Sequence, residues 1–355
     1  MRQVKLRDRV IGDGYPAFII AEMAYSHDGS VDKAKTIIRG AAEAKADAIN
    51  FHITSMKDYM VPQYADGRGR IAAGKDAQHI YDYLCKISLS QEAWKELFAY
   101  ARGRHLLISA MCNDLPSVEF ASQLEPDMYG IHSACLAEED LVTAVAAKKK
   151  PVFLKVGGTY LGEIERAVLL IQKTGSYDIV LMYGIQNYPT KLEDMHLRYI
   201  QSLKQIFSLP VGFADHTDGD SELAMIIPLV ALAFGANVIE KHVTHNRSLK
   251  GVDFESALDP EGLKNLVQNL RGVEKAFGSS AARPFSKAEA DYRQSVKKRT
   301  VARNTLEKGE RITRDKITFK RSDKGIYPDE SQYLIGRSVN TKVEKDEPIT
   351  WDRIT

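Results

Sequence analysis

The 355-residue sequence contains only three cysteines, and their scarcity limits what they can do. Cys85, Cys112 and Cys135 are odd in number and widely spaced, which excludes a disulfide framework and a paired-cysteine zinc motif. The sequence also lacks an apolar run of about 18 residues, the length of a membrane-spanning helix, and its first residues contain no apolar signal segment. We therefore expect a cytoplasmic protein that does not enter a membrane.

An excess of charge of one sign is also missing. Lysine and arginine number 49 against 47 aspartates and glutamates, so the formal net charge is +2. A chain so close to neutral gives no indication of a nucleic-acid partner or of an anionic membrane surface. The hydrophobic fraction of 44% and the charged fraction of 27% are typical of soluble proteins with a sizeable core.

Short apolar runs alternate with helical patterns from residue 17 to about residue 245. No GxGxxG motif opens the first unit, which argues against an open dinucleotide-binding sheet. Eight strands that alternate with helices over this length predict a (β/α)8 TIM barrel. The predicted strands are residues 17–24, 48–55, 106–112, 128–134, 151–158, 178–185, 211–217 and 238–244.

The pattern changes after the predicted closing helix at residues 260–278, where short β-like runs with turn residues replace the alternation. We therefore divide the chain into a catalytic barrel at 1–280, a linker at 281–294 and a small β module at 295–355.

Two histidines end neighbouring predicted strands, His216 in GFADHTDG and His242 in NVIEKHVTHN. In a TIM barrel the chemistry lies at these carboxyl ends of the strands. If both side chains point inward, two neutral imidazoles suit a borderline divalent metal, with water or substrate at the other positions. The alternative for either histidine is an ordinary polar residue at the rim.

Two carboxylates fall in the same region. Glu22 ends the first strand, where burial of its charge is costly unless the group is paired, bound to a ligand or used. Asp253 lies in the loop after strand eight, where it can bind substrate hydroxyls or transfer a proton. The alternatives are a structural salt bridge for Glu22 and a solvated loop residue for Asp253.

Several long motifs together resemble the sialic acid synthase family. The opening FIIAEMAYSHDGSVDKAK, the motifs GFADHTDG and IEKHVTHNRSLKGVDFESALDPEGL, and the final FKRSDKGIYP and YLIGRSV occur in the family's order. The resemblance implies a (β/α)8 barrel followed by an antifreeze-like (SAF) module. It also implies condensation of phosphoenolpyruvate with an N-acetyl aldose to a nine-carbon 2-keto sugar acid, with a divalent metal such as manganese.

The resemblance further implies roles for particular residues. His216 and His242 would hold the metal, Glu22 would face the reacting centre, and Asp253 would assist the acceptor sugar. It implies a domain-swapped homodimer in which Arg321 of one subunit reaches the active site of the other. From its own sequence context alone, Arg321 would pass for a solvated turn residue.

The sequence departs from the family pattern where phosphoenolpyruvate would bind. Asn50 and Gly130 stand where the family has lysines, and His52 stands where it has glutamine. The trianionic donor needs cations to replace its water, so these losses remove most of the compensation for burying it. Ala110 and Ala214 also replace two family hydroxyl residues.

One cation is gained, since Lys155 stands where the family has serine. A lysine at this position is a candidate nucleophile that forms a Schiff base with pyruvate or another keto acid. A relocated phosphate clamp and a simple ion pair with a carboxylate are the alternatives.

We therefore predict an enzyme that makes or breaks a C–C bond between a 2-keto-acid unit, pyruvate or phosphoenolpyruvate, and a sugar aldehyde. A divalent metal (Mn, Mg, Co or Zn) would act as a Lewis acid. The predicted catalytic residues are Glu22, His52, Lys155 and Asp253. The predicted substrate-binding residues are Asn50, Ser133, Gln186, Tyr188, Asp215 and Arg321.

Three alternatives remain open. The family reaction could persist, with Lys155 and Arg321 rebuilding the phosphate site. The barrel could instead catalyse another metal-assisted reaction of a sugar derivative, as an isomerase, epimerase or hydrolase. It could also be a non-catalytic binding subunit.

Overall fold

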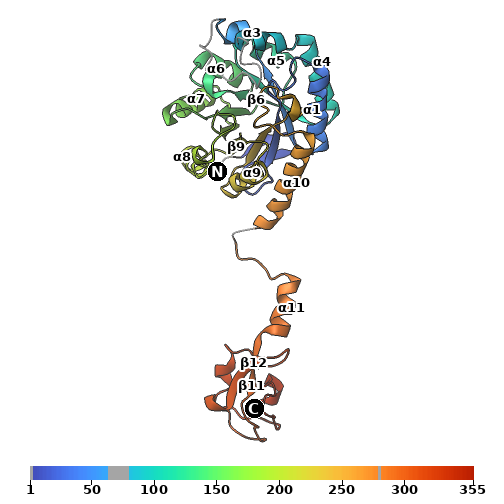
Figure 1. Cartoon of the computed structure of the whole chain (residues 1–355). Helices are drawn as coiled ribbons and strands as arrows, with labels where there is room; N and C mark the ends of the chain where they lie inside the picture. The colour runs from blue at the N-terminus through green and yellow to red at the C-terminus, as the bar shows by residue number, and fades with distance from the viewer. Residues whose placement is uncertain (1–2, 63–79, 279–280) are drawn as a thin grey trace. The chain divides into compact units, whose positions relative to one another are not determined.

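The eight predicted strands close into one parallel barrel in the computed structural model, which describes residues 3–62, 80–278 and 281–355. Figure 1 shows helices on the outside of this barrel. Around the barrel the strands follow the order β10-β3-β4-β5-β6-β7-β8-β9, so the last strand pairs with the first. They are β3 (Phe18–Glu22), β4 (Ala48–Ile53), β5 (Leu107–Cys112), β6 (Met128–Ile131), β7 (Val152–Lys155), β8 (Ile179–Tyr183), β9 (Val211–Asp215) and β10 (Val238–His242). The predicted (β/α)8 barrel is confirmed.

Helices surround the barrel, and several begin where the sequence supplies a capping side chain. Ser30, Ser90 and Asp114 each accept a hydrogen bond from a backbone N–H of the first turn, which would otherwise lack a partner. The helices are α1 (Val31–Glu43), α2 (Met56–Tyr59), α3 (Ile80–Ile87), α4 (Gln91–Gly103), α5 (Leu115–Gln123), α6 (Glu139–Ala147), α7 (Leu161–Lys173), α8 (Tyr199–Phe207), α9 (Leu223–Ala233) and α10 (Pro260–Phe277). Within the described ranges, no helix combines the length and the apolar character needed to cross a membrane.

Successive residues of each barrel strand face different cores. On β3, Ile19 and Ala21 pack in the large core beneath the helices, whereas Phe18 and Ile20 pack inside the barrel. On β10, Ile239 faces the helices and Val238 faces inward in the same way. This two-residue period lets one strand contribute to both cores, and it determines which side chains reach the mouth, the carboxyl ends of the strands.

An N-terminal hairpin, which the sequence did not predict, closes the opposite end of the barrel. Strands β1 (Val4–Leu6) and β2 (Arg9–Ile11) are antiparallel. Val4, Leu6 and Ile11 belong to the same buried cluster as the inward-facing residues of the barrel strands. Apolar side chains therefore fill the barrel from this end, and the polar residues are left at the mouth.

The chain divides into two units, Met1–Phe277 and Gly278–Thr355. The second unit contains α11 (Lys287–Val296) and an antiparallel pair, β11 (Lys298–Ala302) and β12 (Ile317–Arg321). It has a buried apolar cluster of its own. The predicted linker at 281–294 contains most of α11, and the predicted boundary at residue 280 lies outside the described residues.

Candidate active site

Polar side chains occupy the last inward-facing positions of adjacent strands. Glu22 at the end of β3 is in register with His242 on β10 and with Asn50 on β4. His52 lies two residues beyond Asn50, and His216 immediately follows β9. All but the partly buried His52 are 3% exposed or less. The structure therefore brings five of the predicted site residues to neighbouring strand ends.

Glu22 is held as a carboxylate by three donors. The backbone N–H of Ala24 donates to Oε1 at 2.8 Å, and the side-chain amide of Asn50 donates to Oε2. His52 Nε2 lies 3.4 Å from Oε1. Burial alone would raise the pKa of Glu22, but the charge and hydrogen bond of His52 outweigh it, so the pKa falls well below its ordinary range.

The same contact has the opposite effect on the histidine. Burial alone would lower the pKa of His52, but the charge and hydrogen bond of Glu22 raise it above its ordinary value. Glu22 and His52 therefore form a buried charged pair at the mouth, in which the imidazolium can give up a proton and the carboxylate keeps its charge.

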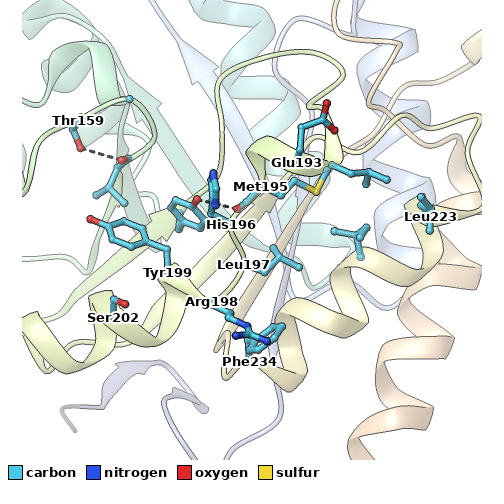
Figure 2. Close-up of a pocket in the computed structure, with 15 residues that line it drawn as sticks. Thr159, Glu193, Met195, His196, Leu197, Arg198, Tyr199, Ser202, Leu223 and Phe234 are labelled. Atoms are coloured by element: carbon cyan, nitrogen blue, oxygen red, sulfur yellow. Dashed lines mark hydrogen bonds between the residues drawn. The ribbon is translucent and has the colours of Figure 1, made fainter.

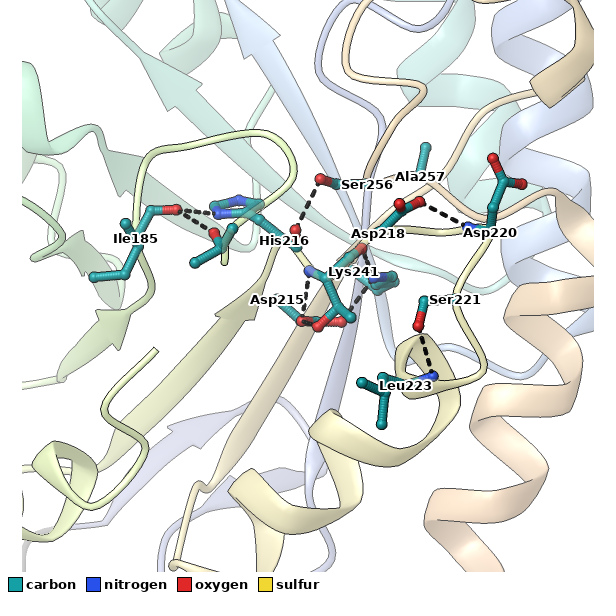
Figure 3. A network of polar contacts seen from close by, with 12 residues as sticks. Ile185, Asp215, His216, Asp218, Asp220, Ser221, Leu223, Lys241, Ser256 and Ala257 are labelled. Atoms are coloured by element: carbon teal, nitrogen blue, oxygen red, sulfur yellow. Dashed lines mark hydrogen bonds and ion pairs between the residues drawn. The ribbon is translucent and has the colours of Figure 1, made fainter. Parts of the chain in front are cut away.

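His216 and His242 form an aromatic cluster with Tyr188. The two imidazole centroids are 5.1 Å apart, and the tyrosine ring lies 4.4 Å from His216 and 5.5 Å from His242. His216 Nδ1 lies 2.6 Å from the carbonyl oxygen of Ile185, which can only accept, so Nδ1 carries the proton (Figure 3). Tyr188 in turn donates to Gln186 Oε1 at 2.8 Å.

Both imidazoles are in the form that binds a metal. Burial lowers the pKa of His216 to about 4, and burial together with repulsion from His216 lowers the pKa of His242 well below its ordinary value. With its proton on Nδ1, His216 has the Nε2 lone pair free for a ligand, the arrangement in which a carbonyl orients a metal-binding histidine. His242 Nδ1 is buried without a hydrogen-bond partner. These features fit a divalent metal.

The described residues include no cluster of three or more His, Cys, Asp or Glu side chains arranged around a metal position. A metal held by His216 and His242 would therefore need substrate atoms or water to complete its coordination.

Asp253 reaches the same place from the loop after β10. Its Oδ2 lies 3.8 Å from His242 Nδ1, and burial raises its pKa to about 7 despite the opposing charge of His52. Its backbone is left-handed, with φ at 58°. The loop thus turns this carboxyl group inward, towards the histidines.

Lys155 forms a buried ion pair across the barrel with Glu240, so the ion-pair alternative considered from the sequence is present in the structure. The side chains of both residues are 5% exposed. Burial raises the pKa of Glu240, and the charge of Lys155 opposes that shift. The sequence places Glu240 on the same face as His242, but nothing local predicts its partner, because the two strands are 85 residues apart.

The inward face of β6 carries no charge at its centre. A Cβ on Gly130 would lie 3.2 Å from Cε of Met111, so the methionine fills the space beside the glycine. His132 follows on the same face, and burial lowers its pKa to about 4. Ser133, predicted to bind substrate, begins the short helix η1 (Ser133–Cys135) and is partly buried.

Asp215, predicted to bind substrate, does not join this cluster. It lies on the other face of β9, fully buried, where Lys241 Nζ approaches Oδ2 to 2.7 Å (Figure 3). Its Oδ1 accepts from the backbone N–H of Thr217 at 2.9 Å. Asp215 therefore braces the turn that carries His216. Arg321 lies in the second unit, where it ends β12 and is exposed.

A separate cavity of about 850 Å³ lies outside the barrel, between the loop after β7, helix α8 and helix α9 (Figure 2). Tyr183, which donates to the carbonyl of Met195 at 2.9 Å, lines it together with Leu223 and Phe234. None of the predicted site residues lines this cavity, so it is distinct from the mouth.

Comparison with known proteins identifies the families that the two units resemble. Residues 37–282 match the NeuB family, and residues 300–355 match the SAF domain. The chain is 34% identical over 99% of its length to an uncharacterized protein of Methanocaldococcus jannaschii, covering 98% of that protein. It is 30% identical over 93% of its length to the N,N'-diacetyllegionaminic acid synthase of Campylobacter jejuni, covering 98% of it.

Solved structures show the same similarity. The N-acetylneuraminic acid synthetase of Leptospira borgpetersenii superposes with a TM-score of 0.71 at 29% identity, covering 83% of this chain and 97% of that one. The NeuB match spans most of the barrel and the SAF match spans the second unit, and the chain therefore belongs to the NeuB family.

Proposed function

We propose that this protein is a sialic-acid-synthase-like enzyme that joins a 2-keto-acid unit to a sugar aldehyde in nonulosonic acid biosynthesis. The observation that carries the proposal is the pair of neutral, inward-facing imidazoles of His216 and His242 beside the charged pair of Glu22 and His52. Relatives named as synthases of legionaminic and neuraminic acids support the same reaction class. The substrates are small molecules, and we expect the enzyme to act in the cytoplasm.

His216 and His242 would hold the divalent metal, which supplies Lewis-acid polarisation of the aldehyde carbonyl. His52, kept protonated by Glu22, is placed to give its proton to the aldehyde oxygen as that oxygen becomes a hydroxyl. Asn50 holds the Glu22 carboxylate in position through its amide.

The remaining predicted residues bind the two substrates. Asp253 accepts hydroxyl hydrogens of the sugar at the side of His242. Tyr188 and Gln186 form one wall of the mouth, and Ser133 lies beyond the end of β6. Lys155 receives the keto-acid unit, as the imine-forming amine or as a cation for its anionic group.

The two units would have separate tasks. We propose residues 1–280 as the catalytic barrel, 281–294 as the linker and 295–355 as the antifreeze-like module, in agreement with the SAF match at 300–355. In a domain-swapped homodimer, Arg321 of one subunit would complete the active site of its partner. Its exposed position at the end of β12 is compatible with that task.

The proposal is tested by supplying manganese, a panel of 2-acetamido and diacetamido hexoses, and either pyruvate or phosphoenolpyruvate. We expect mass spectrometry to detect a 2-keto sugar acid in one donor arm and its absence with His242→Ala. Thermal shifts with each donor show which one binds, because a ligand specific to the folded state raises the melting temperature. Failure to condense any sugar with either donor, with conversion of the sugar alone, would identify an isomerase, epimerase or hydrolase instead.

A further inference from the structure

The loop that carries Asp253, residues 250–258, is hydrogen-bonded to the backbone of His216, which follows β9, and to that of His242, which ends β10. We call it the Asp253 loop. Ser256 in this loop donates from Oγ to the carbonyl oxygen of His216 at 2.9 Å and is fully buried. The bond appears in Figure 3. Asp253 itself has a left-handed backbone, which is uncommon for residues other than glycine and persists where the surroundings hold it.

Arg247, which begins the short helix η3 (Arg247–Leu249), is hydrogen-bonded to the backbone of this loop. Its Nη1 donates to the carbonyl oxygen of Phe254 at 2.7 Å and also to that of Ala257. Its Nη2 pairs with Asp220 at 2.8 Å, but Asp220 is 80% exposed, so that ion pair contributes little. The two hydrogen bonds to carbonyl oxygens are the substantial contacts, because the Arg247 side chain is only 15% exposed.

Gly219, after β9, leaves the space that this guanidinium occupies. A Cβ at Gly219 would lie 2.0 Å from Nη1 of Arg247 and 2.4 Å from the carbonyl oxygen of Ala257. The backbone N–H of Gly219 also donates to the carbonyl of Glu255 at 2.7 Å. Arg247 thus connects the loop that follows β9 to the Asp253 loop.

We propose that Arg247 is a positioning residue that holds the Asp253 loop so that the Asp253 carboxyl group faces the acceptor sugar beside His242. This inference rests on the proposed function, in which Asp253 binds that sugar. Arg247 acts through the backbone of the loop and touches neither substrate nor metal. Its task is specific to Asp253, because the loop carries this one residue to the mouth.

The test is a double-mutant cycle in the full-length enzyme with the sugar and donor that the wild type condenses. We expect Arg247→Met to lower kcat/KM for the sugar by about 10²-fold, as displacement of a positioned group does. In an Asp253→Asn background, Arg247→Met should lower kcat/KM by about twofold or less, because the carboxyl group that Arg247 positions is already lost. Manganese affinity, measured by titration, should stay unchanged in both variants. The proposal would be overturned if Arg247→Met lowered kcat/KM by the same factor in the Asp253→Asn background as in the wild type. A loss of manganese binding would overturn it as well.

Two glycines provide a matched pair if Arg247→Met fails to fold. Gly219→Ala should reproduce the loss, because its Cβ displaces the guanidinium. Gly251→Ala, within the Asp253 loop, should leave kcat/KM unchanged, since no atom lies within 4 Å of its added Cβ. Equal effects of the two substitutions would also overturn the proposal. If the wild type itself condenses no sugar, the proposed function is wrong. That outcome differs from failure of the positioning role, which would appear as altered variants of an active wild type.

Discussion

At the scale of single residues, the partners of the histidines at the mouth give them different charge states. His216 and His242 have no carboxylate in hydrogen-bond contact, and burial leaves them neutral. His52 is buried as well, but the adjacent Glu22 carboxylate keeps it protonated. The partner of each histidine therefore separates the two proposed metal ligands from the proposed proton donor.

The metal assignment predicts that His216→Ala and His242→Ala each abolish tight manganese binding and activity while the fold survives. Each change removes one of the two imidazoles proposed to bind the metal, whereas residues at a barrel rim contribute little to the core. Manganese titration and circular dichroism measure the two effects. His196→Asn, at an exposed position outside the mouth, should keep full metal binding. A His216 or His242 variant with full occupancy would refute the assignment.

The Glu22–His52 pair predicts a pH-dependent contribution to stability. The raised pKa of His52 means that its contribution is complete below the ordinary value of 6.5 and is lost as the pH rises through the folded value. The lowered pKa of Glu22 means that its contribution is present above 4.5 and is lost as the pH falls through its folded value. The pair therefore stabilises the fold most between these two ordinary values.

Urea unfolding of the wild type and of His52→Gln measures this contribution. The difference in unfolding free energy should be larger at about pH 5.5 than at about pH 8.5. A difference that is constant or grows with pH would show that the two side chains do not form a charged pair.

Lys155 predicts a trapped intermediate. Its amine faces the mouth from β7, where addition to a keto-acid carbonyl would form an imine with loss of water. Borohydride reduction in the presence of pyruvate should therefore fix the keto acid on the peptide that contains Lys155, as intact mass and peptide mapping would show. Lys155→Arg should remain unlabelled. If no keto acid is trapped and Lys155→Ala weakens phosphoenolpyruvate binding, the lysine serves as an anion clamp.

At the scale of elements, the two-residue period of the strands could be predicted from the sequence. The alternation places Glu22 on the face of Ile20 and His242 on the face of Val238, and both of these apolar residues belong to the cluster inside the barrel. The same period puts Asp215 on the outer face, where Lys241 binds it. Asp215 and His216 are adjacent in the motif GFADHTDG, and the motif alone did not show that they lie on different faces.

Long-range partners and very short elements could not be predicted in this way. The ion pair of Lys155 with Glu240 depends on how strands close around the barrel, which no local pattern encodes. Strands β1 and β2 have three residues each, too few for a periodic signal. The role of Arg247 was not predicted because its partners are backbone carbonyls, and every residue type has a backbone carbonyl.

The N-terminal hairpin predicts a mutation that changes stability without changing chemistry. Ile11→Ala removes a fully buried side chain of the barrel interior and should cost about 2–5 kcal/mol of unfolding free energy. The kinetic constants of the folded enzyme should remain those of the wild type, because the hairpin fills the end opposite the mouth. Val10→Ala, at a partly exposed position of the same strand, is the control in denaturant unfolding. Equal losses from both variants would contradict burial of Ile11 in this core.

At the scale of the whole molecule, the second unit predicts complementation between subunits. An Arg321→Ala protein and a His242→Ala protein should each be inactive, and mixing them should restore part of the activity. In a domain-swapped dimer, one mixed site combines an intact barrel with an intact module. The measurement is activity after mixing, with exchange of subunits verified by mass spectrometry of differently tagged chains. Proven exchange without recovery would show that each chain completes its own site.

The pairing of β10 with β3 has a consequence for how the chain reaches this structure. Val238 lies in register with Phe18, so the ring closes only when the last barrel strand meets the first. During synthesis β3 leaves the ribosome early and must wait for β10 with one edge unpaired, and β9 has an open edge for a shorter time. Unpaired strand edges promote association with other chains, and pairing between such distant segments is slow. Fragments that end before residue 238 should therefore accumulate as aggregates, even though they contain seven of the eight barrel strands.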